Sequence, residues 1–205
     1  MKKILKLSLI TLTALIIFSC AKEKKVESTE NNGEKFHINA ANSSVEWTAY
    51  KTTDKLPVKG TFTEINILKS SDGNSPTEAL EGVEFEIPVS SIFTKDTLRD
   101  GKLNKFFFEV MKNTMSLKGT FSVTDKTNGN LALTMNGLTE DLPFSYEMRK
   151  DTIVIDATMD LNIWQAKNAV ESLHEACLAL HTGPDGVSKT WEEVAISAKI
   201  LTEKK

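Results

Sequence analysis

The chain has 205 residues, of which 25 are basic and 28 acidic, so that its formal net charge is −3. This acidic balance argues against nucleic acid as a partner, because a surface that binds nucleic acid is basic. The length is sufficient for one domain with a well-buried hydrophobic core.

The N-terminal segment is typical of a secretory signal. A basic start, Met1–Lys6, precedes the apolar run Leu7–Phe18, whose 12 residues are too few to span a bilayer. The four residues Ile17–Cys20 resemble the lipobox of bacterial lipoproteins. The resemblance implies cleavage before Cys20 and acylation of its thiol and new amino group, palmitate being the expected kind of chain. The alternative is a plain signal peptide in which Cys20 follows the cut by chance.

Removal of the signal peptide, residues 1–19, leaves 22 basic and 28 acidic residues, a net charge of −6. That charge disfavours electrostatic adhesion to anionic lipid, so the acyl anchor has to hold the protein on a membrane. Residues 20–35 are interpreted as the lipidated cysteine and a flexible tether, since Val26 is their one aliphatic residue of any size. The folded domain is predicted over 36–205. Its single thiol, Cys177, excludes an internal disulfide.

Apolar residues then alternate with polar ones, the period of strands that have one wet face. Eight segments carry this pattern: 45–49, 58–68, 83–89, 115–123, 131–135, 142–148, 153–163 and 194–200. The second of them changes phase between Phe62 and Ile65, which indicates a β-bulge. Asn136-Gly137 predicts a two-residue hairpin between the fifth and sixth.

Eight long strands joined mostly by short turns predict an all-β fold, an eight-stranded antiparallel barrel. A sandwich is the alternative, but closure removes the exposed sheet edges. Two short helical insertions are expected. One covers 94–109, and the other covers 165–181, where apolar residues recur every three or four positions. Helices of a barrel protein most naturally cover its open ends.

The order and spacing of several motifs resemble the YceI-like family of lipocalin-like barrels. The motifs are Ser44-Val45-Glu46-Trp47, Val58–Phe62, Val89–Thr94, Leu98-Arg99-Asp100, Phe106–Phe108, Leu131–Thr139 and Val194-Ala195-Ile196. The resemblance runs from about Phe36 to Ile200. It implies an elongated barrel with an apolar tunnel that holds a long-chain amphiphile, typically an isoprenoid or a related lipid. No other cofactor is expected.

The inward row of the strands supplies candidate ligand contacts. These are Trp47, Phe62, Phe85, Phe121, Met135, Phe144 and Met159. Aromatic rings and thioethers give a long apolar ligand a large and adaptable contact area. Alternation alone does not distinguish the lining of a cavity from a dry core, so a packed interior is the alternative. The family resemblance favours the cavity.

A second hypothesis is a metal or redox site. His174, Cys177 and His181 lie at positions i, i+3 and i+7, which share one face of a continuous helix. Imidazole and thiolate are ligands that zinc and copper prefer. The alternative is that all three are structural, because an unpaired cysteine is often a small buried hydrophobe.

No catalytic motif stands out in the chain, which has no G-x-S-x-G elbow, phosphate-binding glycine loop or H-E-x-x-H pair. We therefore expect a binding protein and not an enzyme. Its expected partners are a hydrophobic small molecule and, through the lipid anchor, a membrane of the bacterial cell envelope. Ala21 after Cys20 resembles the signal for sorting to the outer membrane in some bacteria. The sequence does not decide between the periplasmic and the outer face of that membrane. Related barrels can pair, so a homodimer is left open.

Overall fold

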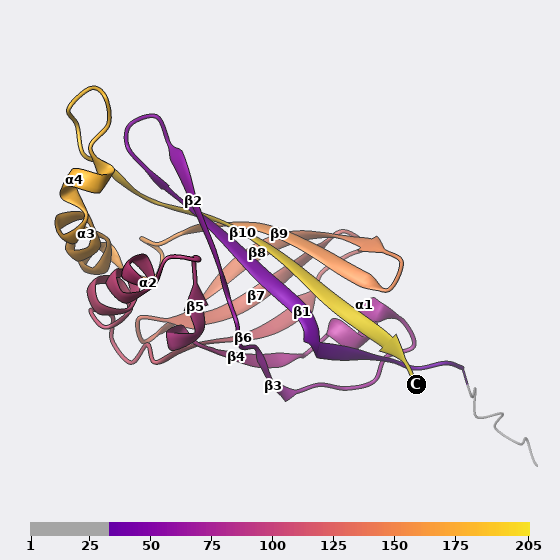
Figure 1. Ribbon diagram of the computed structural model, residues 1–205. Helices are drawn as coiled ribbons and strands as arrows, with labels where there is room; N and C mark the ends of the chain where they lie inside the picture. The colour runs from indigo at the N-terminus through magenta and orange to yellow at the C-terminus, as the bar shows by residue number, and fades with distance from the viewer. Residues whose placement is uncertain (1–32) are drawn as a thin grey trace, which may run out of the picture. The chain divides into compact units, whose positions relative to one another are not determined.

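The computed structural model describes residues 33–205, which form one compact unit. The predicted signal peptide, Cys20 and most of the tether lie outside the described residues. Ten antiparallel strands make a single sheet in the order β3-β4-β6-β7-β8-β9-β10-β1-β2-β5 (Figure 1). The strands are β1 (Phe36–Lys51), β2 (Leu56–Phe62), β3 (Asn66–Lys69), β4 (Glu84–Pro88), β5 (Ile92–Phe93), β6 (Ser116–Val123), β7 (Asn128–Met135), β8 (Leu138–Arg149), β9 (Thr152–Asp160) and β10 (Thr190–Lys204).

The sheet closes into the predicted barrel through the pairing of two of its eight strands, each of which is interrupted once. β2 continues into β3 and β4 continues into β5, each after three residues, so that ten segments follow eight paths. β2 pairs with β5 and β3 pairs with β4, which joins the two ends of the sheet. The interruptions lie beside each other, where the Thr63 amide donates to the Ser91 carbonyl at 2.9 Å. The phase change predicted after Phe62 is this break.

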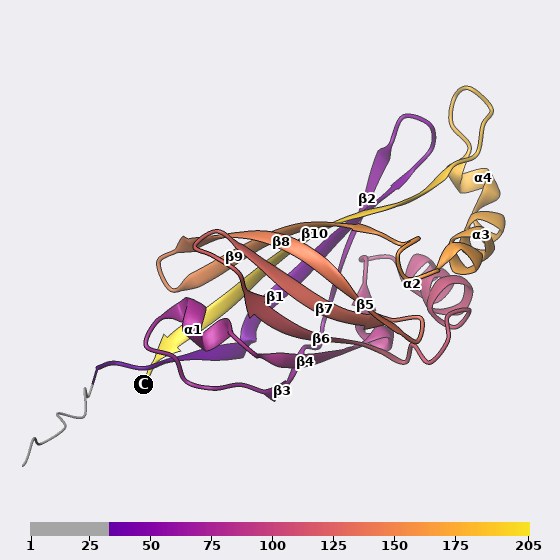
Figure 2. The same ribbon diagram turned by 180° about the vertical axis from the view of Figure 1, so that it is seen from behind.

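Helices lie at both ends of the barrel (Figures 1 and 2). The predicted insertions are α2 (Thr97–Leu103), which runs on as a π-helical turn η2 (Asn104–Phe108), and the pair α3 (Lys167–Ala176) and α4 (Leu178–His181). We call their end of the molecule the helical end. The opposite end holds a helix that the sequence did not predict, α1 (Pro76–Leu80), whose Ala79 and Leu80 are fully buried. A short 3-10 turn, η1 (Val89–Ser91), separates β4 from β5.

The β7–β8 turn confirms the predicted hairpin. Asn136 and Gly137 have φ angles of +53° and +72°, the left-handed pair that a type I′ turn requires. The Asn136 side chain also fixes the surroundings of the turn. It accepts from the Lys112 amide at 2.8 Å and donates to the Trp164 carbonyl at 2.8 Å. The turn is thereby tied to the segment that leads into α3.

Among residues 33–205, no helix is both long enough and apolar enough to cross a bilayer. β1 pairs with β10 along most of its length, and Phe36 lies opposite Lys204. The start of the described chain and its C-terminus therefore lie together, at the end of the barrel away from α2, α3 and α4 (Figure 1).

Candidate functional site

The seven predicted lining residues all lie inside the barrel, and the structure divides them into two groups. Trp47, Phe62, Met135 and Met159 line a cavity of about 110 Å³ beneath the helices, which we call the proximal cavity. Phe85, Phe121 and Phe144 line a second cavity of about 90 Å³, the distal cavity. Ile196 of β10 lines both. Ligand contact by these residues stays a prediction.

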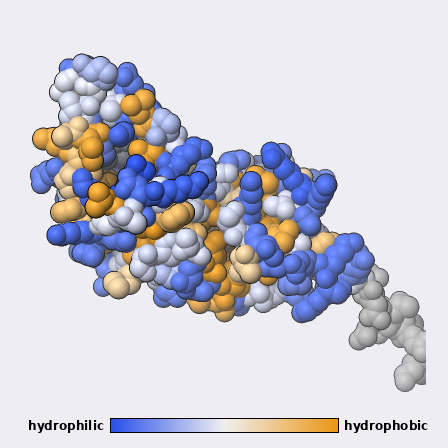
Figure 3. Space-filling view, in the orientation of Figure 1, coloured by the Kyte–Doolittle hydropathy of each residue, from blue (hydrophilic) through white to orange (hydrophobic). Residues whose placement is uncertain are grey.

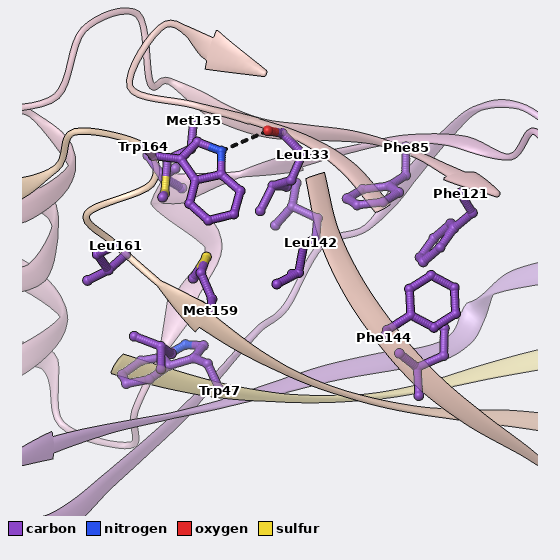
Figure 4. Packing of buried hydrophobic residues seen from close by; sticks show 14 of the residues in the cluster. Trp47, Phe85, Phe121, Leu133, Met135, Leu142, Phe144, Met159, Leu161 and Trp164 are labelled. Atoms are coloured by element: carbon purple, nitrogen blue, oxygen red, sulfur yellow. Dashed lines mark hydrogen bonds between the residues drawn. The ribbon is translucent and has the colours of Figure 1, made fainter. Parts of the chain in front are cut away.

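Two leucines separate the groups. In Figure 4, Leu133 of β7 and Leu142 of β8 lie between the residues of the proximal cavity and the three phenylalanines of the distal cavity. Both are buried, with 7% and 4% of their surface exposed. Leucine side chains change rotamer readily compared with backbone, so this partition is made of movable groups. We call the two cavities together, with the leucines between them, the apolar column of the barrel.

The proximal cavity opens toward the helical end. A larger hollow of about 620 Å³, which we call the vestibule, lies among β1, α2, η2, α3 and α4. Five residues line both the vestibule and the proximal cavity, and we call them the neck. They are Trp47, Ala49, Leu103, Leu173 and Thr190. A chain that enters the barrel from the vestibule has to pass these side chains.

Aromatic rings on the barrel wall lie over glycines of the neighbouring strand. Trp47 is paired with Gly60, and a Cβ at Gly60 would collide with the indole. Phe85 has the same relation to Gly119. A ring that covers a glycine lies along the sheet and reaches less far across the barrel. In the distal cavity Phe85 and Phe121 then contact each other, with ring centroids 5.3 Å apart.

The vestibule differs from the barrel interior in its charge. Four cations line it, Lys51, Arg99, Lys102 and Lys105. Asp96 is the one carboxylate among the residues that line the vestibule, and it is paired with Arg99 at 3.4 Å. On the face drawn in Figure 3, hydrophobic and hydrophilic residues lie intermixed over the helices. The site therefore has an apolar interior and a mouth with excess positive charge.

Two of these cations also hold the helices in place. Lys51 donates to the Leu180 carbonyl at 3.1 Å, and Lys102 donates to the Ala176 carbonyl at 3.3 Å. Carbonyls at the end of a helix have no partner within the helix, and a cation there is favourable. The contacts connect β1 and α2 to α3 and α4 across the vestibule.

The predicted metal site does not form. The helix breaks at Cys177, which caps α3 with a φ of −120°, so the continuous helix that the metal hypothesis assumed is not present. His174 and His181 both direct Nδ1 to the Thr190 hydroxyl, at 3.0 and 2.6 Å. Among residues 33–205, no three His, Cys, Asp or Glu side chains are grouped as metal ligands. Burial raises the pKa of the Cys177 thiol, which also disfavours a reactive thiolate.

His181 is held in its neutral form. Burial lowers its pKa to about 4, and the neighbouring charges of Lys51, His174 and Lys102 act in the same direction. Neutral imidazole can accept from or donate to the Thr190 hydroxyl, which lies at the neck. The two histidines and Thr190 therefore form a polar cluster beside the apolar interior.

This lowered pKa predicts an acid-dependent loss of stability. Between pH 6.5 and about 4 the unfolded chain binds a proton at His181 that the folded protein excludes. The free energy of unfolding should therefore fall as the pH is lowered through this window. Urea denaturation at several pH values measures the effect, and His181→Asn should flatten its dependence on pH. An equal slope in both proteins would contradict the assignment.

Several lining residues were not predicted from the sequence. Leu103, Phe107 and Phe108 from α2 and η2 and Val170 and Leu173 from α3 close the proximal cavity. Their spacing predicted helices, and the apolar faces of those helices were the available signal. A further buried residue lies outside every periodic run. Trp164 is fully buried and donates its indole N–H to the Leu133 carbonyl at 2.8 Å.

A closed antiparallel barrel with an apolar interior and a helix-lined mouth defines a lipocalin-like protein. The YceI-like domain model matches residues 36–200. The chain belongs to the YceI-like family, and the resemblance inferred from its motifs is confirmed. No curated protein matches it in sequence.

Two solved structures share the fold. A polyisoprenoid-binding domain from Saccharophagus degradans is 12% identical over 83% of this chain and 98% of its own, with a TM-score of 0.60. Burkholderia cenocepacia BcnA is 16% identical over 81% of this chain and 99% of its own, with a TM-score of 0.50. At these identities the likeness establishes the architecture.

Proposed function

We propose that the barrel binds a long-chain amphiphile, an isoprenoid or a similar lipid, with its apolar tail inside the barrel. The observation that carries the proposal is the apolar column of proximal and distal cavities, which meets a cation-lined vestibule at the neck. Binding sites for apolar ligands have this composition, with a few polar groups that fix orientation. The polyisoprenoid-binding domain of Saccharophagus degradans, which shares the fold, supports the same ligand class.

The interior suits a flexible chain. Pockets for small molecules usually enclose about 300–1,000 Å³, whereas the proximal and distal cavities measure about 110 and 90 Å³. A long tail therefore has to displace Leu133 and Leu142, after which the two spaces join. Met135 and Met159 adapt to such a change because their side chains have three rotatable bonds and a polarisable sulfur.

The polar head would stay in the vestibule. Lys51, Lys102 and Lys105 are positioned there to attract phosphate or another anionic head, and the tail alone passes the neck. The proposed role is carriage, storage or scavenging of the lipid without catalysis. The sequence lacks the catalytic motifs that would indicate a reaction.

The test is a titration of residues 22–205 with a long-chain prenyl phosphate. Trp47 lines the neck, so its fluorescence should change as the tail enters. We expect a saturable change that ends at one lipid per protein. A prenyl phosphate that leaves the fluorescence unchanged and is not retained by the protein would overturn the proposal.

We also propose that the protein is a lipoprotein of the bacterial cell envelope, anchored through Cys20 to the outer membrane. The lipobox-like residues Ile17–Cys20 support this. The described domain begins at the end opposite the vestibule. The 15 residues of the tether, Ala21–Lys35, span at most roughly 50 Å when extended. The anchor would thus keep the barrel near the membrane and leave its mouth free.

Cys20→Ser tests this proposal. Without an acyl acceptor the protein should move from the membrane fraction to the soluble fraction, because the acyl chains supply nearly all of its membrane affinity. Mass spectrometry of the N-terminal peptide should show acylation in the wild type alone. Cys177→Ser is the matched control and should stay in the membrane fraction. Unchanged fractionation of Cys20→Ser would refute anchoring at this residue.

A further inference from the structure

One buried hydrogen-bond donor at the neck has no partner within the described domain, residues 33–205. Trp47 is 7% exposed, and its Nε1 finds no acceptor among residues 33–205. Buried polar groups are nearly always hydrogen-bonded, and an unpartnered one calls for an explanation. Its location supplies one, because Trp47 lines both the proximal cavity and the vestibule.

The other two tryptophans show what the fold does with an indole N–H elsewhere. Trp164 donates to the Leu133 carbonyl at 2.8 Å, and Trp191 donates to the Thr52 carbonyl at 2.8 Å. Both of these indoles are therefore satisfied within the protein. Trp47 differs from them in lining the neck, which a chain entering from the vestibule has to pass.

The position of Trp47 is fixed from two sides. Its strand neighbours are Gly60 on β2 and Ile196 on β10. Gly60 has no Cβ, and the indole occupies the space that a Cβ would need. A ring seated in this way cannot turn its N–H to a distant acceptor without losing its place on the wall. The indole is therefore held on the barrel wall at the neck.

We infer that Trp47 Nε1 donates a hydrogen bond to an oxygen of the ligand at the point where its apolar tail meets its head. The inference rests on the proposed function and narrows its substrate class. The ligand would carry a hydrogen-bond acceptor, such as a hydroxyl, carbonyl or phosphate-ester oxygen, on the first atoms of the head. A hydrocarbon of the same length would leave the indole unpartnered and bind more weakly.

Thr190 supports the same reading of the neck. It is the first residue of β10 and lines the neck, and its hydroxyl is engaged by His174 and His181. That hydroxyl therefore has little capacity left for a ligand, whereas the indole N–H is free. Trp47 is thus a specificity-determining residue, and the cations of the vestibule are left to act on the outer part of the head.

The experiment is a competition. Residues 22–205 are offered an equimolar mixture of a long-chain prenyl alcohol and the hydrocarbon of the same chain length, and the retained ratio is measured by mass spectrometry. We expect the wild type to favour the alcohol about fivefold, the usual net value of one hydrogen bond. Trp47→Phe keeps an aromatic ring at the neck and removes the N–H, so it should retain both lipids about equally.

Trp164→Phe is the matched control. It loses the same atoms from a buried indole, but its N–H serves the Leu133 carbonyl, so the preference for the alcohol should remain. Thermal melting should separate the variants as well. Trp47→Phe should melt closer to the wild type than Trp164→Phe, because it removes a donor that has no partner among residues 33–205.

The outcomes are distinguishable. An unchanged preference for the alcohol in a folded Trp47→Phe protein would overturn the role of this indole and leave lipid binding intact. Equal retention of the two lipids by the wild type would do the same. If the wild type retains neither lipid, the proposed function itself fails, and the inference falls with it.

Discussion

Trp164→Ala is expected to lower the free energy of unfolding by about 3–5 kcal/mol, the usual cost of removing a large buried aromatic side chain. Trp164 is the largest of the fully buried side chains in the described domain, and none of its surface is exposed. Its carbonyl also accepts from the Asn136 side chain at 2.8 Å. The residue thus joins the β7–β8 turn to the segment before α3. Urea denaturation measures the loss.

Trp164→Phe separates packing from hydrogen bonding. It keeps most of the apolar volume and removes one hydrogen bond to the Leu133 carbonyl, so a loss of about 0.5–1.5 kcal/mol is expected. If the alanine variant loses less than about 1 kcal/mol, Trp164 is not the anchor that its burial indicates.

Ala49→Trp is expected to weaken binding of a long-chain prenyl phosphate at least about tenfold. Ala49 is the smallest residue of the neck, and an indole there would fill the passage between the vestibule and the proximal cavity. Each CH₂ group kept out of the barrel forfeits roughly 0.8 kcal/mol. Exclusion of about two such groups already costs a factor of ten in affinity. Fluorescence titration, or lipid retention after dilution, measures the change.

The control is Ala132→Trp, the same substitution on β7. Ala132 lies on the face opposite Leu131 and Leu133, so its side chain points away from the interior. The Ala132→Trp protein should bind the prenyl phosphate with the affinity of the wild type. Overpacking at the neck can cost about 1–3 kcal/mol of stability, so both variants are compared at a temperature where both are folded. Wild-type affinity in Ala49→Trp would show that the tail does not enter through the neck.

The barrel could be predicted from the sequence because its strands obey a simple rule. Side chains alternate between water and core with period two, so Phe144 and Tyr146 of β8 are buried while the residues between and beside them are exposed. The turn at Asn136-Gly137 could be predicted for a similar reason. Its conformation depends on these two residues alone, because both have to adopt a positive φ. The predicted strand that ends at Ile163 was too long, because β9 ends at Asp160 and Ile163 is 49% exposed.

The site was less accessible to such reasoning. The alternation of apolar and polar residues shows which face of the sheet a side chain takes, but not its position along the barrel axis. Met135 and Phe121 could therefore not be assigned to different cavities. Trp164 follows no period, because a turn after β9 positions it. The metal hypothesis assumed an unbroken helix. In the structure α3 ends at Ala176 and α4 begins at Leu178, a break that the three- and four-residue spacing of apolar residues did not reveal.

The most direct measurement is mass spectrometry of residues 22–205 purified from the source bacterium, under native conditions and after organic extraction. If the apolar column of the barrel holds the tail of a lipid, the wild type should carry one long-chain lipid per protein and Ala49→Trp should carry little or none. A folded wild-type barrel that yields no lipid, or equal amounts of lipid from both proteins, would contradict binding inside the barrel.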